Sequence, residues 1–517
     1  MEVFANLAMG IQNAMTPTNL LFLFVGSMVG MVVGIFPGLG PSAGIAILLP
    51  ITFGMDSTTA VVMLAAIYYA GMYGATLTSI LLNVPGASAV VASTFDGYPL
   101  AKNGRAGPAL VMQAMASFVG GTVGVLLITV LAPVFSRMAR SFGPPEFFML
   151  VMMGMLTLVI MVGANWRYGV LSGLIGFGLA TVGVDLVTGR QRYTFGSAEL
   201  IGGIDFIPIA IGLFGIGELL YSLHQGAHRG ESGMLQYRNE ERFWPTAMDW
   251  FESRWTFVRG SILGFVVGVI PGAGATIASL MAYSFEKSAS KTPEKFGTGH
   301  MPGLVAPETA NNAASAGAMI PLLTLGIPGS ASTAVLLGAF LLWGLRPGPL
   351  LMTQEPVFAW TLIGSMYLGN MMLVALCIFA IPLFVAVLRV PYQILAPIVV
   401  LLSVVGTFAV NGSMVETWLM LAAGGLGYLM KRFGYSPAAL VVALVLGPLA
   451  EDTLRQTLTI SRGSYMIFLQ RPVALTLALV TIGLMLLLTV MNRLQRSTVA
   501  TAQHKPADDV DDVVEPG

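Results

Sequence analysis

The chain has 517 residues, of which 56% are hydrophobic and only 10% are charged. The 25 Lys and Arg residues balance the 25 Asp and Glu residues, so the formal net charge of zero does not indicate a nucleic-acid surface or a steering field. This composition lies far outside the range of soluble globular proteins. It indicates an integral membrane protein.

Long uncharged apolar segments recur along almost the whole sequence. A helix that crosses a bilayer needs about 20 apolar residues, whereas the strands of a membrane barrel alternate over about ten residues. The segments here are long and alternate weakly, so the sequence predicts an all-α polytopic membrane protein. The segments expected to span the membrane fully or partly are 18–36, 58–82, 108–135, 146–164, 168–187, 203–222, 256–270, 308–326, 331–345, 358–385, 391–410, 414–430, 436–449 and 472–491.

The order of these segments predicts two homologous halves. A first membrane repeat is expected over residues 1–222, followed by a polar connecting loop over 223–259 and a second membrane repeat over 260–495. Residues 496–517 are acidic and poor in large apolar residues, which predicts a disordered tail.

The first sign of duplication is a glycine-rich break inside an apolar segment. Residues 30–40 read GMVVGIFPGLG and residues 264–274 read GFVVGVIPGAG. Proline removes a backbone donor and disrupts the preceding helical turn, so both segments are expected to be broken or re-entrant helices. The G-x-x-x-G part alone is also typical of close packing between membrane helices, which remains an alternative for those glycines.

Two further pairs of motifs follow in the same order. LLNVPGASA around Pro85 corresponds to LTLGIPGSAS around Pro328, and GRAGPAL corresponds to GLRPGPLL. The longer spacing between the breaks in the second half is accounted for by the polar insertion at 286–299. These pairs indicate an internal duplication, and an inverted repeat is typical of transporter folds built in this way.

The breaks predict a binding site near the middle of the membrane. Unpaired backbone groups cost several kcal/mol each in lipid, so they persist only in the protein interior or beside a wet cavity. Helix N-termini favour a carboxylate, while unwound carbonyls and hydroxyls favour a small cation. The residues expected to bind the substrate are Gly38, Gly40, Ser42, Asn83, Pro85, Gly86, Ser88, Gly272, Gly274, Thr276, Asn311, Asn312, Pro328, Gly329 and Ser330.

A coupling cation is expected beside the same breaks. Interhelical hydrogen bonding is an alternative role for the hydroxyls. Glu308 is predicted to open a helix, where it can alternatively complement the helix dipole. The residues expected to bind the cation are Thr76, Ser79, Thr324, Ser332 and Glu308.

The remaining ionisable residues have structural interpretations. Asp96 precedes a glycine and is predicted to form a turn. Glu451 and Arg455 stand four residues apart, which favours a pair on a helix surface. Asp185 and Asp205 are expected in loops.

No metal or cofactor is expected. His224 and His228 have the i, i+4 spacing of a metal pair, but Gly226 lies between them and no cluster of acidic ligands is near in the sequence. Their spacing is therefore interpreted as chance.

These motifs resemble those of a known family. The sequence resembles the large transmembrane subunit, the TctA family, of the tripartite tricarboxylate transporters, from about residue 20 to residue 490. The resemblance implies uptake of organic carboxylates across the bacterial inner membrane, driven by a sodium or proton gradient. It also implies two partners, a periplasmic solute-binding protein and a small transmembrane subunit. The stretches that carry it include GIFPGLGPSAGIAILLP, YGATLTSILLNVPG, FDGYPLAKNGRAGPAL, VAPETANNAASAGAMIPLLTLGIPGSASTAVLLGA and GPLAEDTLRQTL.

Two positions depart from the pattern of that family. Ala87 follows the Pro85-Gly86 break where a glutamate is common, and Pro302 stands before Gly303 where a glutamate is also common. Each change removes an acid near the inferred site. The substrate or the coupling is therefore expected to differ from that of the tricarboxylate namesake.

The lead hypothesis is a secondary active transporter with alternating access, in which an elevator-like movement carries the paired breaks. The alternatives are a passive channel or scaffold subunit and, less favoured, a membrane-embedded enzyme. The enzyme is less favoured because all four histidines, His224, His228, His300 and His504, lie in polar connections or the tail.

Overall fold

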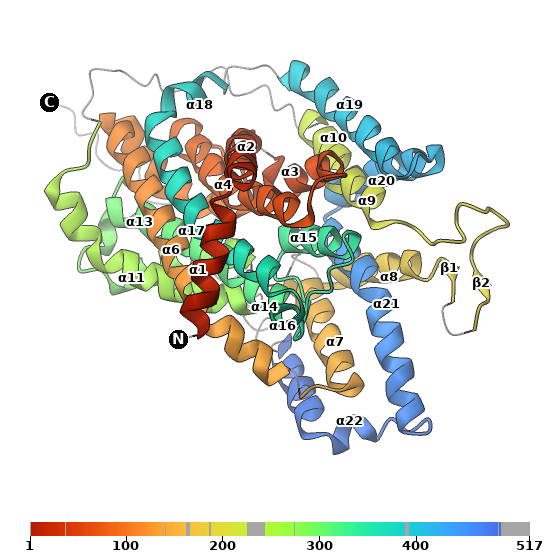
Figure 1. Ribbon diagram of the computed structural model, residues 1–517. Coiled ribbons are helices and arrows are strands. Elements are labelled where there is room, and N and C mark those ends of the chain that lie inside the picture. The colour runs from red at the N-terminus through yellow and green to blue at the C-terminus, as the bar shows by residue number, and fades with distance from the viewer. Residues whose placement is uncertain are drawn as a thin grey trace, which may run out of the picture.

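The computed structural model describes residues 2–36, 38–139, 141–161, 166–185, 188–224, 243–272, 274–387, 392–483 and 485–486. Nearly all the regular structure in these ranges is helical (Figure 1). Six of the described helices are long and apolar enough to cross a membrane. This confirms the prediction of an all-α polytopic membrane protein. The six are Pro17–Ile35, Ser57–Leu82, Ser88–Ala139, Phe206–His224, Pro356–Phe379 and Pro437–Ile460, of which Ser88–Ala139 and Phe206–His224 are continuous helical runs that each contain two of the helices named below.

The helices follow one another closely along the chain, with a small hairpin of two antiparallel strands between α8 and α9. Up to residue 224 the elements are α1 Glu2–Ala14, α2 Pro17–Ile35, α3 Gly40–Leu48, α4 Ser57–Leu82, α5 Val91–Leu100, α6 Ala106–Ala139, α7 Pro144–Met161, α8 Trp166–Ala180, β1 Gly183–Val184, β2 Gln191–Arg192, α9 Phe206–Ala210 and α10 Gly217–His224. After them come α11 Ala247–Val269, α12 Gly274–Ala289, α13 Met301–Gly317, α14 Met319–Leu325, α15 Ala331–Leu342, α16 Leu351–Gln354, α17 Pro356–Phe379, α18 Ile381–Val387, α19 Tyr392–Asn411, α20 Met414–Arg432, α21 Pro437–Ile460 and α22 Ile467–Gln470, with a further apolar helix over Pro472–Gly483.

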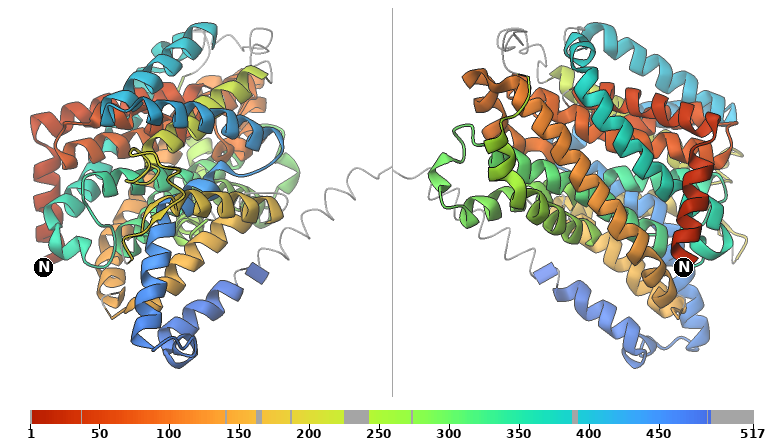
Figure 2. Two further views of the ribbon diagram at one scale, coloured as in Figure 1. Left: turned by 90° about the vertical axis from the view of Figure 1, so that its right-hand side faces the viewer. Right: turned by 60° about the vertical axis from the view of Figure 1, so that its left-hand side comes forward.

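Helices from distant parts of the sequence form the core. Helix α13 packs between α6 and α11, and α17 lies against both α4 and α6 (Figure 1). Helices α2 and α4 lie side by side, and α6 runs across the helical body (Figure 2). The hairpin of β1 and β2 lies at the periphery. Because α13 contacts α4, α5 and α6 as well as α11 and α12, it brings the two halves of the sequence together.

Several helix boundaries differ from the prediction, among them the end of α8, which lies at Ala180 rather than at residue 187. Helix α11 begins at Ala247, inside the expected connecting loop, because Thr246 and Asp249 form a capping box. Helix α13 begins at Met301 rather than at residue 308. Helix α21 runs on to Ile460, beyond the expected end at 449, because its last turns pack polar side chains against the hairpin.

The paired glycines before each break pack helices closely. A methyl group on Gly34 would lie 2.3 Å from the carbonyl oxygen of Gly71 in α4. On Gly264 it would lie 2.3 Å from the carbonyl oxygen of Ala310 in α13. The structure therefore shows the close-packing alternative for these glycines in both halves: Gly34 packs α2 against α4, and Gly264 packs α11 against α13.

Replacing Gly264 with leucine is expected to lower the free energy of unfolding by about 1–3 kcal/mol, because the side chain must push α11 away from the backbone of α13. Thermal unfolding of the purified protein in detergent measures this. Gly425 in α20 is the matched control, since a side chain there meets no atom within 4 Å. Equal losses for the two leucine variants would contradict the packing assigned to Gly264.

The first break has the same backbone geometry in both halves. The C-cap residue of α2, Phe36, has φ −78° and ψ 115°, and the C-cap residue of α11, Ile270, has φ −75° and ψ 116°. Two residues further on, Gly38 has φ 93° and Gly272 has φ 85°. These positive values favour glycine, which explains why the motif repeats it. Pro37, between Phe36 and Gly38, lies outside the described residues.

The second break, at Pro85-Gly86 in the first half and Pro328-Gly329 in the second, also begins with the same backbone conformation in the two halves. Asn83 is the C-cap residue of α4 and Gly326 that of α14, and both are in the left-handed region, with φ 57° and 71°. Pro85 and Pro328 follow two residues later, where a proline cannot continue a helix. The matching conformations follow from matching turn residues in the sequence.

Candidate functional site

A single buried carboxylate lies at the centre of the helical body. All 17 residues of α13 are buried, and Glu308 in its middle is 0% exposed. The carboxylate accepts hydrogen bonds from Thr76 of α4, 3.0 Å from each oxygen, and from Ser117 of α6 at 3.3 Å. The hydroxyl of Ser93 in α5 donates a third. Four helices therefore meet at Glu308.

The prediction that Glu308 opens a helix was wrong. Helix α13 begins seven residues earlier because Pro302 fits its first turn, where the missing N–H costs nothing. The dipole alternative also fails, because the effect of a helix dipole falls off within the first turn and Glu308 lies two turns inside. The carboxylate needs another source of compensation.

The structure joins Thr76 with Glu308, two of the five residues predicted for the cation. Ser79 instead donates to the carbonyl of Ala75 at 3.2 Å, and Thr324 donates to the carbonyl of Ile320 at 2.8 Å. Ser332 is buried near the start of α15. In the described part of the chain no hydrogen bond joins these three to Glu308.

Ser93 and Ser117 were missed by the sequence analysis. Each lies in an apolar stretch with no local pattern that distinguishes it from other serines in membrane helices. Only the packing of α5 and α6 against α13 brings them to Glu308. The signal available from sequence was the acid itself, because an ionisable residue in an apolar segment is a candidate for function.

The chemistry of this centre suits a small cation. An ionised carboxylate is costly to bury unless it is paired, and Glu308 takes part in none of the ion pairs among the described residues. Its neighbours offer hydroxyl oxygens and no positive charge. A proton can neutralise the carboxylate directly, and a sodium ion can be held by the same oxygen atoms.

The two breaks of the first half lie together, and the second of them binds Ala75, the residue next to Thr76 of the Glu308 site. The N–H of Gly86 donates to the carbonyl of Ala75 at 3.2 Å, and Ala75 precedes Thr76. A methyl group on Gly86 would lie 2.4 Å from the carbonyl oxygen of Gly34, close to the end of α2. The second break therefore folds back onto the helix that carries the first.

Hydrogen bonds link the breaks of the two halves. The hydroxyls of Ser88 and Thr276 are 3.0 Å apart, which joins the second break of the first half to the first break of the second half. The N–H of Gly272 donates to the carbonyl of Gly329 at 3.0 Å, which joins the two breaks of the second half. The four breaks thus form one connected group.

The helices that follow the first breaks begin beside open space. A methyl group on Gly40, the first residue of α3, or on Gly274, the first residue of α12, would meet no atom within 4 Å beyond its chain neighbours. Gly40 is nevertheless buried. Helix N-termini carry unpaired N–H groups and favour anions, so each start leaves room and a favourable potential for a carboxylate.

Unsatisfied polar groups lie on the two central helices. In the described structure the hydroxyls of Tyr69 and Tyr73 on α4 and the side-chain nitrogen of Asn311 on α13 are buried without a hydrogen-bond partner. Asn312 donates to the backbone carbonyl of Glu308 at 3.1 Å. Each unsatisfied group costs about 1–3 kcal/mol, which a bound ligand or water would recover.

The other predicted substrate residues have varied positions. Asn83 is exposed where it ends α4, and Ser42 is half-buried in the first turn of α3. Pro328 is buried and Pro85 half-buried between helices. Ser330 caps the N-terminus of α15. All lie at the breaks, although Asn83 and Ser330 have local backbone roles.

The Tripartite tricarboxylate transporter TctA family model matches residues 20–442. This chain belongs to that family. It is 41% identical over 477 residues to an uncharacterized 52.8 kDa protein in the TAR-I ttuC′ 3′ region of Agrobacterium vitis, covering 92% of this chain and 94% of the relative. It is 42% identical over 214 residues to an uncharacterized protein in the TAR-II ttuC′ 3′ region of the same organism, covering 41% of this chain and 88% of that relative. No solved structure matches it.

Membership of the TctA family makes the chain a transporter subunit of a tripartite system. Together with the six apolar helices, it also makes the chain a multi-pass membrane protein. The family match covers the four breaks and Glu308.

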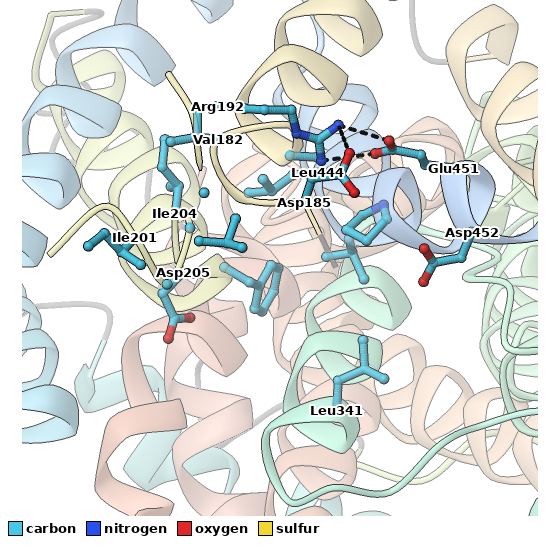
Figure 3. Close-up of a pocket in the computed structure, with 18 of the residues that line it drawn as sticks. Val182, Asp185, Arg192, Ile201, Ile204, Asp205, Leu341, Leu444, Glu451 and Asp452 are labelled. Atoms are coloured by element: carbon cyan, nitrogen blue, oxygen red, sulfur yellow. Dashed lines mark hydrogen bonds and ion pairs between the residues drawn. The ribbon is translucent and has the colours of Figure 1, made fainter. Parts of the chain in front are cut away.

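A cavity of about 580 Å³ in this TctA-family protein is lined mainly by the hairpin, residues 201–206, α15 and α21 rather than by the breaks. Charged residues gather at one end of it (Figure 3). Arg192 donates to Glu451 at 2.8 Å, and Arg455 donates to Asp185 at 2.8 Å and to Glu451 at 2.6 Å. The predicted pair of Glu451 and Arg455 is confirmed, but it belongs to a network of four residues.

Asp185 follows β1 outside regular structure, as predicted, and Asp205 caps the N-terminus of α9. The hydrogen bond to Glu451 is the main reason why the pKa of Arg192 is raised above its ordinary value. The cavity also has Asp205 and Asp452 in its lining. Acidic groups therefore outnumber basic ones, which disfavours an organic carboxylate as its occupant.

Replacing Arg455 with alanine is expected to loosen the hairpin, because Asp185 loses the bidentate partner that holds it to α21. Trypsin cleavage after the exposed Arg190 should become several-fold faster. Replacing Arg432, which contacts Tyr428 of its own helix, is the control. Unchanged cleavage in the Arg455 variant would contradict a role of this network in anchoring the hairpin.

Proposed function

We propose that this protein is the large transmembrane subunit of a secondary active transporter that takes up small organic carboxylates across the bacterial inner membrane, coupled to a cation gradient. The observation that carries the proposal is the meeting of four paired helix breaks beside the buried carboxylate of Glu308. A substrate site and a cation site that share neighbouring backbone can be coupled. Family membership supports the transport class.

The substrate carboxylates bind at the breaks. The N-termini of α3 and α12 supply unpaired N–H groups beside open space at Gly40 and Gly274. The hydroxyls of Tyr69 and Tyr73 supply further buried donors. This arrangement uses dipoles and neutral donors, which cost less in a membrane than a fixed positive charge.

The coupling cation is a sodium ion or a proton held at Glu308. Thr76, Ser93 and Ser117 orient the carboxylate and offer oxygen ligands. Thr76 is next to Ala75, whose carbonyl binds the second break. Binding of the cation therefore favours one position of that break, which links it to the substrate.

Alternating access follows from the duplication. The matching geometry of the breaks supports an internal duplication, and we propose that the repeat is inverted, with one group of helices that carries the breaks and moves, elevator-like, past the rest. A periplasmic solute-binding protein delivers the substrate, and a small transmembrane subunit completes the complex. Ala87 at the second break and Pro302 in α13 replace acids common in the family, so the substrate is expected to differ from citrate.

Uptake into vesicles tests the proposal. The full complex is supplied with labelled mono-, di- and tricarboxylates under an imposed sodium or proton gradient. Uptake of one acid that depends on one gradient names both substrate and ion. Failure of every acid and both gradients, with the complex shown to be assembled, would overturn the assignment.

A further inference from the structure

Asp96 has a role that the predicted turn does not explain. The prediction was wrong, because Asp96 lies inside α5 and is 0% exposed. Its carboxylate accepts hydrogen bonds from the backbone N–H groups of Gly297, Gly299 and His300 at 2.8–3.0 Å. The hydroxyl of Tyr283 in α12 donates a fourth at 3.0 Å. A buried carboxylate with this many donors is a strong and directional contact.

The three backbone donors immediately precede α13. Asp96 therefore binds, from a different helix, the N–H of His300, the N-cap residue of α13; in a capping box this role belongs to the side chain of the third helical residue. His300, the residue before Met301, makes no side-chain capping bond itself. A methyl group on Gly303 would lie 2.1 Å from the Asp96 carboxylate, so the first turn of α13 fits closely around it.

Helix α5 contacts α13 at two points one helical turn apart. Asp96 holds the start of α13, and Ser93, three residues earlier on α5, donates to Glu308 further along α13. Residues three apart lie on the same face of a helix. The position of the Ser93 hydroxyl at Glu308 is thus set by the anchorage of Asp96.

Helix α12 supports the same placement. At one end of the contact between α12 and the segment 88–96, Tyr283 packs edge-on against Phe95, with ring centroids 5.2 Å apart. At the other end, the hydroxyls of Ser88 and Thr276 are hydrogen-bonded. The segment that carries Ser93 is therefore fixed at both ends. The polar insertion at 286–299, which has no counterpart in the first half, supplies two of the N–H groups that bind Asp96.

We propose that Asp96 is a positioning residue for the cation site, because it holds Ser93 of α5 against Glu308 of α13. This inference rests on the proposed function of Glu308. It goes further by making Gly297 and Gly299, in the insertion at 286–299, part of the coupling machinery, although neither forms a hydrogen bond with Glu308 in the described structure.

The test measures thermal unfolding of the full-length purified protein in a series of sodium chloride concentrations, with choline chloride holding ionic strength constant, and in a series of pH values. The protein is expected to show a saturable stabilisation in one series. In Asp96→Asn the sodium concentration at half-effect should rise by roughly tenfold or more, because the asparagine side chain forms weaker bonds than a charged group. If the cation is a proton, the pH at half-effect should instead fall by about one unit.

Asp249→Asn is the matched control. Asp249 is also a buried aspartate that caps a helix and binds a group from the other half, Arg105 at 2.6 Å. That variant should lower the unfolding temperature without moving the cation half-effect. Asp96→Asn with a lowered unfolding temperature and an unmoved half-effect would overturn the inference and leave Asp96 as a structural cap.

Two milder variants cover the case that Asp96→Asn does not fold. Tyr283→Phe removes one hydrogen-bond donor to Asp96 and keeps the ring, and Gly303→Ala places a methyl group against the Asp96 carboxylate. Both variants should raise the cation concentration at half-effect, by roughly two- to fivefold. Glu308→Gln separates the two claims. If the Glu308→Gln protein retains the saturable stabilisation, the cation site at Glu308 is wrong and the inference about Asp96 is wrong with it. If that protein loses the stabilisation while the variants of Asp96, Tyr283 and Gly303 behave as the unmodified protein, only the role of Asp96 is refuted.

Discussion

Replacing Glu308 with glutamine is expected to abolish cation-driven uptake and to leave the protein folded. Glutamine has the same shape, and its carbonyl oxygen can still accept hydrogen bonds from Thr76, Ser93 and Ser117. It can neither take up a proton nor neutralise a sodium ion. Uptake should fall by roughly a hundredfold, the factor that corresponds to about 3 kcal/mol of lost cation binding.

The stability of the Glu308→Gln protein should be equal to or above that of the unmodified protein, because a buried charge no longer has to be desolvated. Thermal unfolding measures this alongside uptake. Glu286→Gln is the control, since Glu286 is also buried but is paired with Arg259 in an ion pair away from the breaks. Normal cation-driven uptake by the Glu308 variant would remove Glu308 from the mechanism.

Replacing Gly272 with valine is expected to abolish substrate uptake. Gly272 has φ 85°, and a β-branched side chain there carries strain of about 1–3 kcal/mol. The chain can relieve this strain only by changing the backbone conformation around Gly272. That change breaks the 3.0 Å hydrogen bond to Gly329, which joins the two breaks of the second half.

Gly463 provides a matched control for the valine substitution. It has φ 86°, nearly the same as Gly272, but it lies in the turn after α21 and a side chain there meets no atom within 4 Å. Both variants therefore carry similar backbone strain. Uptake should fall at least tenfold for Gly272→Val and less than about twofold for Gly463→Val. Equal uptake by the two variants would refute a substrate site at the breaks.

The breaks could be predicted from sequence because their geometry is local. Proline and glycine determine the backbone within two or three residues, so the repeated motif is accompanied by repeated φ values at Gly38 and Gly272. Segment 58–82 was predicted within one residue of α4 for a related reason: a long apolar run between Asp56, which caps it, and Asn83, which ends it, has distinct boundaries.

The centre at Glu308 could be predicted only in part. Thr76 and Glu308 were expected together because both lie near breaks, but the positions of Ser93 and Ser117 depend on helix packing that no spacing encodes. The start of α13 was missed because Pro307 indicates a helix boundary, whereas α13 accommodates it in its interior.

Asp96 and the hairpin show the same limit of local reasoning. Aspartate before glycine is typical of a turn, and the partners that keep Asp96 helical lie about 200 residues away in the sequence. Glu451 and Arg455 were paired correctly from their spacing, yet Asp185 and Arg192 join them only through the tertiary fold.

The accumulation of substrate against its own concentration gradient tests the central claim most directly. Vesicles that contain the full complex are loaded with unlabelled acid, given an inward cation gradient and supplied with the labelled acid identified in the uptake panel. The internal concentration should rise above the external one and should collapse when an ionophore dissipates the cation gradient. Equilibration to equal concentrations, unaffected by the ionophore, would show a passive channel and contradict coupling at Glu308.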